Sequence, residues 1–320
     1  MNVKDQLKAI LVWMGSTDMK FMVKPKPPFN FALSANFLSA RDDQISNYSN
    51  GRYWRVLRAG DKLILATVGF VGDVDEPRLT IELRSNDPLA REDRLASERQ
   101  IRLIFDVDFD LKPFYDAMKS DRVMSTLISR LRGLRCGSTP TVFEALIYSI
   151  TEQQISLNVA FAIQRRLVKE FGDRLEIDGR LYYAFPTPAR LASASVDDLQ
   201  SCGLSMKKAG YIREISRMIV EGSCDVEGLK GYGDEEVIDK LRRIRGVGIW
   251  TAELVMVRGM HRFGVTPADD LGLRRCISRY YCGGRMISGD EARRIAERWG
   301  EWKGLASFYL IVANRLDLGI

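Results

Sequence analysis

Histidine is the residue type that this sequence has least of, with a single imidazole, His261, in 320 residues. A zinc site of the HExxH type needs two histidines and is therefore excluded. A Ser-His-Asp triad would have to use His261 itself, which no nucleophile motif accompanies. We interpret His261 as a loop residue just after the Arg258-Gly259 turn. Acid–base chemistry in this protein is therefore expected to depend on carboxylates.

Cysteine is also scarce, and its spacing follows no known pattern. There is no CxxC pair and no four-cysteine iron–sulfur spacing, which argues against a zinc site, a cluster or a disulfide framework. We expect free, buried thiols and no metal centre. The five cysteines are Cys136, Cys202, Cys224, Cys276 and Cys282.

Long hydrophobic runs are absent as well. No run approaches the roughly 20 apolar residues that span a bilayer. The apolar stretch nearest the N-terminus, residues 9–14, is too short even for the core of a signal peptide. We expect a soluble, intracellular (cytoplasmic) protein that has no membrane partner.

The overall composition is that of an ordinary globular protein, 46% hydrophobic and 28% charged, which excludes a wholly disordered or collagen-like chain. A length of 320 residues exceeds the usual single-domain size, so two or three packed units are expected. The net charge of +6 favours a polyanionic partner without proving one, because many basic proteins simply carry solvated lysines.

The first third of the chain is predicted to be mainly sheet. Short apolar-rich runs separated by turn-forming residues predict strands over residues 53–58, 63–71 and 78–84. We expect an antiparallel sheet domain over residues 1–117, with helices over about 39–46 and 88–105.

From about residue 118 the hydrophobic period becomes helical. One apolar stripe at helical spacing consists of Phe143, Leu146, Ile147 and Ile150. Ser156 and Ser205 are predicted N-caps of two further helices. The predicted fold class is α+β, with an all-helical domain over 118–320. Within it, residues 140–260 carry a helical hairpin, and 118–139 are expected to pack with 261–320 across a cleft.

The hairpin is the most informative motif. Within residues 241–254, one helix ends, a tight turn of Gly246, Val247 and Gly248 follows, and a second helix begins. Free amides of the turn and of the second helix would point outward together, as a phosphate-binding site requires. The alternative is a plain helix–glycine–helix corner. Three arginines beside the turn favour DNA-backbone binding: Arg242, Arg243 and Arg245.

Two adjacent carboxylates, Asp269 and Asp270, precede the next predicted helix. Asp270 lies 270 − 246 = 24 residues beyond Gly246, a distance that suits one helix out and a loop back toward the bound phosphate. Taken alone, either aspartate is more simply the N-cap of a helix over residues 271–280.

Hairpin, spacing and the Pro-x-Asp-Asp segment together resemble the helix-hairpin-helix DNA glycosylases, and among them 3-methyladenine DNA glycosylase II. The resemblance runs over nearly the whole chain, at residues 27–37, 143–156, 185–188, 203–205 and 296–302. It implies a monofunctional enzyme of base excision repair that acts on double-stranded DNA. Such an enzyme flips out a damaged, alkylated base and hydrolyses its N-glycosidic bond to leave an abasic site.

The resemblance also implies roles for individual residues. Asp270 corresponds to the catalytic aspartate, and its neighbour Asp269 is expected to face away and cap the helix. Trp250 corresponds to one aromatic wall of the base pocket and Phe37 to a second, contributed by the first domain. The implied DNA contacts are Gly246, Val247, Gly248, Arg245, Thr251 and Gln154.

Departures from the family pattern carry information too. Bifunctional members have a lysine where Trp250 stands, and a lysine attacks the sugar as a Schiff-base nucleophile. Tryptophan cannot, so the resemblance implies hydrolysis by water. Gln154 falls at or next to the wedge that fills the vacated base stack, and a solvent-facing loop glutamine is the alternative. Pocket positions that are aromatic in the alkyl-base enzyme are here Leu254, Leu271 and Ile311.

Two rival functions remain open. One is a glycosylase/lyase for oxidised bases such as 8-oxoguanine that recruits a lysine from elsewhere, for example Lys207 or Lys208. The other is a helix-hairpin-helix DNA-binding protein that has no chemistry. We expect a monomer that needs no cofactor, and a monovalent cation held by hairpin carbonyls stays open.

Overall fold

The computed structural model describes residues 17–319. The apolar stretch at residues 9–14 lies outside this range. Among the described residues, no helix has both the length and the apolar character needed to cross a membrane.

The N-terminal part is built on one antiparallel sheet with the strand order β1-β5-β4-β3-β2. The strands are β1 Asp18–Val23, β2 Ser46–Ser49, β3 Arg52–Ala59, β4 Lys62–Val71 and β5 Arg78–Arg84. The strands predicted at 53–58, 63–71 and 78–84 are confirmed as β3, β4 and β5. The prediction lacks β1 and β2, both edge strands whose residues are mostly exposed or half-buried. β2 has only four residues, whereas the alternation of Met19, Phe21 and Val23 in β1 was a local signal that the prediction missed.

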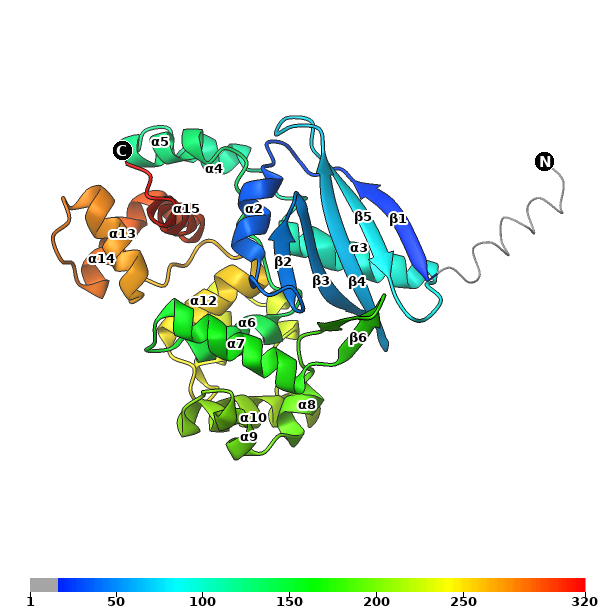
Figure 1. Cartoon of the computed structure of the whole chain (residues 1–320). Helices are drawn as coiled ribbons and strands as arrows, with labels where there is room; N and C mark the ends of the chain where they lie inside the picture. The colour runs from blue at the N-terminus through cyan, green and yellow to red at the C-terminus, as the bar shows by residue number, and fades with distance from the viewer. Residues whose placement is uncertain (1–16, 320) are drawn as a thin grey trace.

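Two helices accompany the sheet, α2 (Phe31–Leu38) and α3 (Arg91–Phe105). α3 runs behind the strands in the view of Figure 1. It buries Ile101 and Ile104 in the core that the sheet contributes. The helix predicted over 88–105 is therefore confirmed.

The helix predicted over residues 39–46 is wrong. α2 ends at Leu38. Beyond it, the Asp42 carboxylate accepts the backbone N–H of Gln44 at 2.9 Å, and Asp42 N donates to Ser46 O at 3.3 Å. Short acidic side chains compete in this way for backbone groups, which favours a turn over a helix.

The rest of the chain is mainly helical. Its helices are α4 Lys112–Ala117, α5 Arg122–Arg130, α6 Val142–Glu152, α7 Leu157–Phe171, α8 Pro188–Ser193, α9 Val196–Ser201, α10 Met206–Val220, α11 Asp234–Arg242, α12 Ile249–Met260, α13 Leu271–Tyr281, α14 Gly289–Ala296 and α15 Lys303–Arg315, with 3-10 helices η1 Gly228–Gly231 and η2 Glu297–Trp302. The caps predicted at Ser156 and Ser205 are confirmed, because each hydroxyl accepts a backbone N–H in the first turn of α7 or α10.

The expectation that this part is all-helical is wrong at one place. β6 (Arg174–Ile177) and β7 (Arg180–Tyr183) form an antiparallel hairpin that packs on the main sheet. Its turn is Asp178-Gly179, and both residues have positive φ, at 52° and 73°. Asp-Gly is a preferred sequence for a two-residue hairpin turn, so a local signal existed.

Along the chain, Val107 is the last residue of the sheet core and Leu111 is the first residue of the helical core. Arg135, which is fully buried, ties the two together, because its guanidinium donates to the backbone carbonyls of Lys26 and Phe109 and to that of Pro28 at 3.0 Å.

In the helical part, α4 and α5 lie beside α15 (Figure 1). Asp121, the N-cap of α5, accepts hydrogen bonds from Tyr281 Oη at 2.9 Å and Trp299 Nε1 at 3.2 Å. These bonds link the segment around residues 118–139 to the C-terminal helices.

His261 is the C-cap of α12, with a φ of 54°, and its Nδ1 lies 3.1 Å from Asp106 Oδ1. It is therefore tied to the junction between the two cores. All five cysteines are free thiols. Within residues 17–319, no group of three or more His, Cys, Asp or Glu side chains is arranged to hold a metal ion.

Candidate active site

The predicted helical hairpin is confirmed. α11 ends at Arg242 and α12 begins at Ile249. Between them Gly246 has a φ of +90°, and a Cβ at this position would lie 2.3 Å from the ring of Tyr211 on α10. Glycine is therefore required here both by the backbone conformation and by the close approach of the tyrosine.

The N-terminus of α12 is open to an anion. Its N-cap, Gly248, offers no side-chain cap, so the amides of the first helical turn have no intrahelical or side-chain partner. Arg245 is exposed beside the turn, with its guanidinium carbon 5.9 Å from the centre of the Tyr211 ring. Free amides and a nearby cation together suit a phosphate group.

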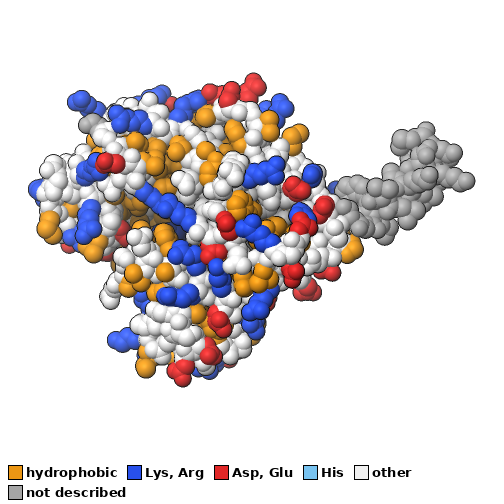
Figure 2. All heavy atoms as spheres, in the orientation of Figure 1, with side chains coloured by type: hydrophobic (Ala, Val, Ile, Leu, Met, Phe, Trp, Pro, Cys, Tyr) orange, Lys and Arg blue, Asp and Glu red, His pale blue; other side chains and the backbone are white. Residues whose placement is uncertain are grey.

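Figure 2 shows basic side chains gathered on the face seen in Figure 1. That face is hollowed near its centre, with hydrophobic side chains on the rim and Lys and Arg side chains across the hollow. Basic side chains in a hollow of the surface favour a polyanionic ligand.

Gln153 connects the loop after α6 to the hairpin, and the sequence analysis did not predict this role. Its Nε2 donates to Gly246 O at 2.8 Å and to Thr251 Oγ1 at 3.0 Å. The Thr251 side chain is 2% exposed and engaged with Gln153. The Thr251 hydroxyl is thus occupied inside the protein, and a contact of Thr251 with DNA stays a prediction.

Gln154, the next residue, is exposed and has a φ of +54°. Ile155 in the same loop and Leu157, the first residue of α7, are also exposed. Lys208 on α10 fixes the base of this loop, because its Nζ donates to the carbonyls of Thr151 at 2.9 Å and Gln153 at 2.6 Å. Partial burial lowers the pKa of Lys208. Gln154 is thus presented at the tip of an anchored loop.

Asp270 is the N-cap of α13, and its Oδ1 accepts the backbone N–H of Leu273 at 2.8 Å. The expectation that Asp269 caps this helix is therefore wrong. Asp269 instead faces α14, where its Oδ2 lies 3.6 Å from Arg293 Nη2. Asp270 is half-buried, and the neighbouring Leu271 is 62% exposed, so this end of α13 is open to a ligand.

The predicted pocket residues fall into two groups. On α12, Trp250 is half-buried and Leu254 is buried one turn further along the same face. The Trp250 Nε1 is buried and has no hydrogen-bond partner among residues 17–319. In the second group, Phe37 packs edge-to-face on Phe308 of α15 at 5.3 Å, and Ile311 lies one turn further along that helix.

Arg315 is a cation that the sequence analysis did not single out. Its guanidinium carbon lies 4.8 Å from the centre of the Phe37 ring. Burial, with the charge of Arg41 in addition, lowers the pKa of Arg315. Helical periodicity alone places residues 311 and 315 on one face of α15, but it does not predict the contact with a ring of the N-terminal part.

Comparisons with known proteins agree with this geometry. Residues 147–301 match the model of the HhH-GPD superfamily base excision DNA repair proteins. The chain is 33% identical to a DNA-3-methyladenine glycosylase of Bacillus subtilis, over 94% of this chain and 98% of the relative. It is 26% identical to DNA-3-methyladenine glycosylase 2 of Escherichia coli, over 89% and 94% of the two chains.

The chain belongs to the HhH-GPD superfamily of base excision DNA repair proteins.

A solved structure, 3-methyladenine DNA glycosylase from Archaeoglobus fulgidus, superposes on this HhH-GPD protein with a TM-score of 0.82. The two are 29% identical, and the match covers 94% of this chain and all of the other. The predicted family, the α+β fold and the enzyme class, DNA glycosylase, are thereby confirmed. The superfamily match spans the hairpin, Trp250 and both aspartates, whereas Phe37, Ile311 and Arg315 lie outside it.

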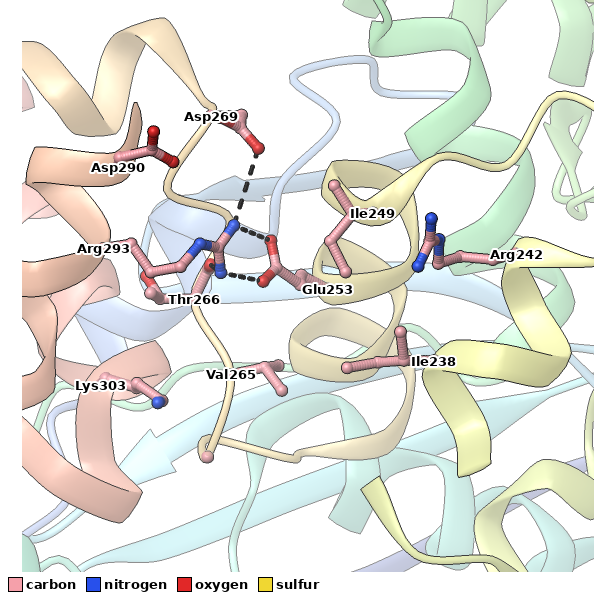
Figure 3. A pocket seen from close by; sticks show the side chains of 11 residues that line it. Ile238, Arg242, Ile249, Glu253, Val265, Thr266, Asp269, Asp290, Arg293 and Lys303 are labelled. Carbon is pink, nitrogen blue, oxygen red and sulfur yellow. Dashed lines mark hydrogen bonds and ion pairs between the residues drawn. The ribbon is translucent and has the colours of Figure 1, made fainter. Parts of the chain in front are cut away.

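This DNA glycosylase also contains a cavity of about 570 Å³ between α11, α12, the segment that precedes α13, α14 and the start of α15 (Figure 3). Ile249 and Asp269 both line it. Ile249 directly precedes Trp250, and Asp269 directly precedes Asp270. The starts of α12 and α13 therefore border the same cavity. Glu253 also lines it, and burial raises the pKa of this carboxyl, an effect that the neighbouring Arg293 opposes.

Proposed function

We propose that the protein is a monofunctional DNA glycosylase that removes an alkylated base from double-stranded DNA by hydrolysis and leaves an intact abasic strand. The observation that carries the proposal is Asp270, a half-buried carboxylate at the start of α13 beside an exposed Leu271. The names of the relatives, DNA-3-methyladenine glycosylases, support an alkylated base as the substrate.

In the proposed complex, the hairpin holds the DNA backbone. The amides of Gly248 and of the first turn of α12 bind one phosphate, and Arg245 adds charge. These contacts fix the position of the DNA without reading its sequence. Gln154, at the tip of the anchored loop, fills the space that the flipped base leaves.

The chemistry follows from the charge that develops on the sugar. As the glycosidic bond breaks, the deoxyribose comes to resemble an oxocarbenium ion. The Asp270 carboxylate stabilises this cation and orients or deprotonates the attacking water. Trp250 and Phe37 stack on the extruded base. The remaining pocket wall is aliphatic, formed by Leu254, Leu271 and Ile311.

No lysine nucleophile, cofactor or second protomer is part of the proposal. The Lys208 Nζ already donates to two backbone carbonyls, which supports a structural role for this lysine. A monovalent cation held by hairpin carbonyls stays a separate hypothesis, and the hydrolysis proposed here does not use it.

A base-release assay tests the proposal. Wild-type protein is incubated with duplexes that carry alkylated, deaminated or oxidised bases, and the free base and the product strand are both analysed. We expect release from alkylated DNA, a strand that breaks only on heating with alkali, and no covalent adduct after borohydride. Efficient borohydride trapping would show a Schiff-base lyase, and binding to abasic DNA without release of any base would show a protein that only binds DNA.

A further inference from the structure

Arg293 on α14 contacts Glu253, Thr266 and Asp269 (Figure 3). Both of its terminal nitrogens donate to the Glu253 carboxylate on α12, with Nη2 3.4 Å from Oε2. Nη1 lies 3.4 Å from Thr266 O, and Nη2 lies 3.6 Å from Asp269 Oδ2. One guanidinium thus connects α12 with both ends of the segment that leads to Asp270.

The acidic partner of this contact is deeply buried. The Glu253 side chain is 3% exposed, whereas that of Arg293 is 36% exposed and lines the cavity. A buried carboxylate without a partner is strongly destabilising, so Glu253 requires the guanidinium. The contact with Asp269, whose side chain is 52% exposed, contributes orientation more than stability.

A second observation independently holds Asp269 against α14. Gly289, the first residue of that helix, lies so close that an added Cβ would be 2.2 Å from Asp269 Oδ1. Gly289 and Arg293 are four residues apart and therefore share one face of α14. The Asp269 carboxylate is consequently confined between a glycine and a guanidinium on the same helix.

We propose that Arg293 and Glu253 are positioning residues that fix Asp270 relative to Trp250 during base release. Glu253 lies three residues after Trp250, one turn along α12, and Asp270 directly follows Asp269. The clamp therefore joins the helix that carries the pocket wall to the segment that carries the proposed catalytic carboxylate. The inference rests on the proposed function in one respect only, the catalytic role of Asp270.

The test uses the full-length protein and duplex DNA treated with a methylating agent. Release of methylated purine is measured with enzyme in excess, alongside affinity for an abasic-site analogue and thermal unfolding. Arg293→Gln leaves Glu253 buried and unpaired, so the decisive variant is the double change Glu253→Gln/Arg293→Gln. The double change removes both charges, so no carboxylate is left buried without its partner, and Asp269 loses its cation.

We expect the double variant to release base about 10- to 100-fold more slowly, because a displacement of about 1 Å costs on that order in rate. Its affinity for the abasic-site analogue should change by less than about threefold, because the hairpin is untouched. The matched control is Arg55→Gln/Glu144→Gln, which neutralises another buried ion pair, 3.1 Å long, between β3 and α6. That variant should unfold more easily but release base at the wild-type rate.

Two results would overturn the inference. One is a double variant that releases base as fast as the wild type. The other is a loss of rate that the Arg55/Glu144 control shares. Asp270→Asn, measured in the same assay, separates this inference from the proposed function. If Asp270→Asn is fully active, the catalytic assignment fails, and if only Asp270→Asn is slow, the positioning role alone fails.

Discussion

At the scale of single residues, the hairpin depends most directly on Gly246. Its positive φ and the adjacent Tyr211 ring exclude a side chain. We expect Gly246→Ala to lower the free energy of unfolding by about 1–3 kcal/mol, the usual cost of a non-glycine residue in a strained conformation. DNA affinity should fall as well, because the amides next to position 246 move. Chemical denaturation and a DNA-binding titration measure the two effects.

Gly248 supplies the matched control for this prediction. It is extended, and a Cβ there would meet nothing within 4 Å. Gly248→Ala should therefore unfold like the wild type. Equal stability of the two alanine variants would show that the contact between Tyr211 and Gly246 does not determine the shape of the turn.

At the scale of elements, the exposed N-terminus of α12 and the arginines beside the preceding glycine turn should make DNA binding steeply dependent on salt. Each phosphate contact that is lost should reduce the slope of log K against log salt by about 0.9. We expect Arg245→Ala to reduce it by about that amount and to weaken binding to all sequences alike. Arg99→Ala, which removes an exposed arginine on α3 of the sheet part, is the control. An unchanged slope for Arg245→Ala would remove this residue from the interface.

The sequence predicts elements well where the signal is local. The serine caps of α7 and α10 and the glycine turn between α11 and α12 involve residues within a few positions of one another, and all three are confirmed. The Asp178-Gly179 turn was an equally local signal that the helical period around it obscured.

A local pattern cannot decide between two adjacent residues of the same type. Asp269 and Asp270 can each cap α13, and only the approach of α14 decides that Asp269 turns toward Arg293. Gln153 and Gln154 can likewise each face inward, and the carbonyl of Gly246 decides in favour of Gln153. Both decisions depend on residues distant in sequence, so no local pattern contains them.

At the scale of the whole molecule, the candidate site draws on residues of both parts of the chain. Phe37 comes from the sheet part and packs on α15, while Trp250 and Asp270 come from the helical part. The buried Arg135 joins the two parts through its hydrogen bond to the backbone carbonyl of Pro28. Such a junction keeps the walls of a cleft in a fixed relation, as binding of an extruded base requires.

The measurement that tests the account most directly is base release by Asp270→Asn under single-turnover conditions. Asparagine keeps the size of the side chain and most of the N-cap hydrogen bonding, so stability should change by less than about 1 kcal/mol. It removes a negative charge that faces a developing cation, and losing one such group costs about 100- to 1,000-fold in rate. Affinity for an abasic-site analogue should stay intact or improve.

Asp269→Asn is the control for this measurement. Its carboxylate faces α14 and not the start of α13, and the oxygen of an asparagine there can still accept from Arg293. We therefore expect a loss of less than about tenfold, well below the effect of an electrostatic group that acts on the reacting atoms. The account predicts an inactive, folded Asp270→Asn and an active Asp269→Asn. An Asp270→Asn variant that is folded and releases base at the wild-type rate would contradict it.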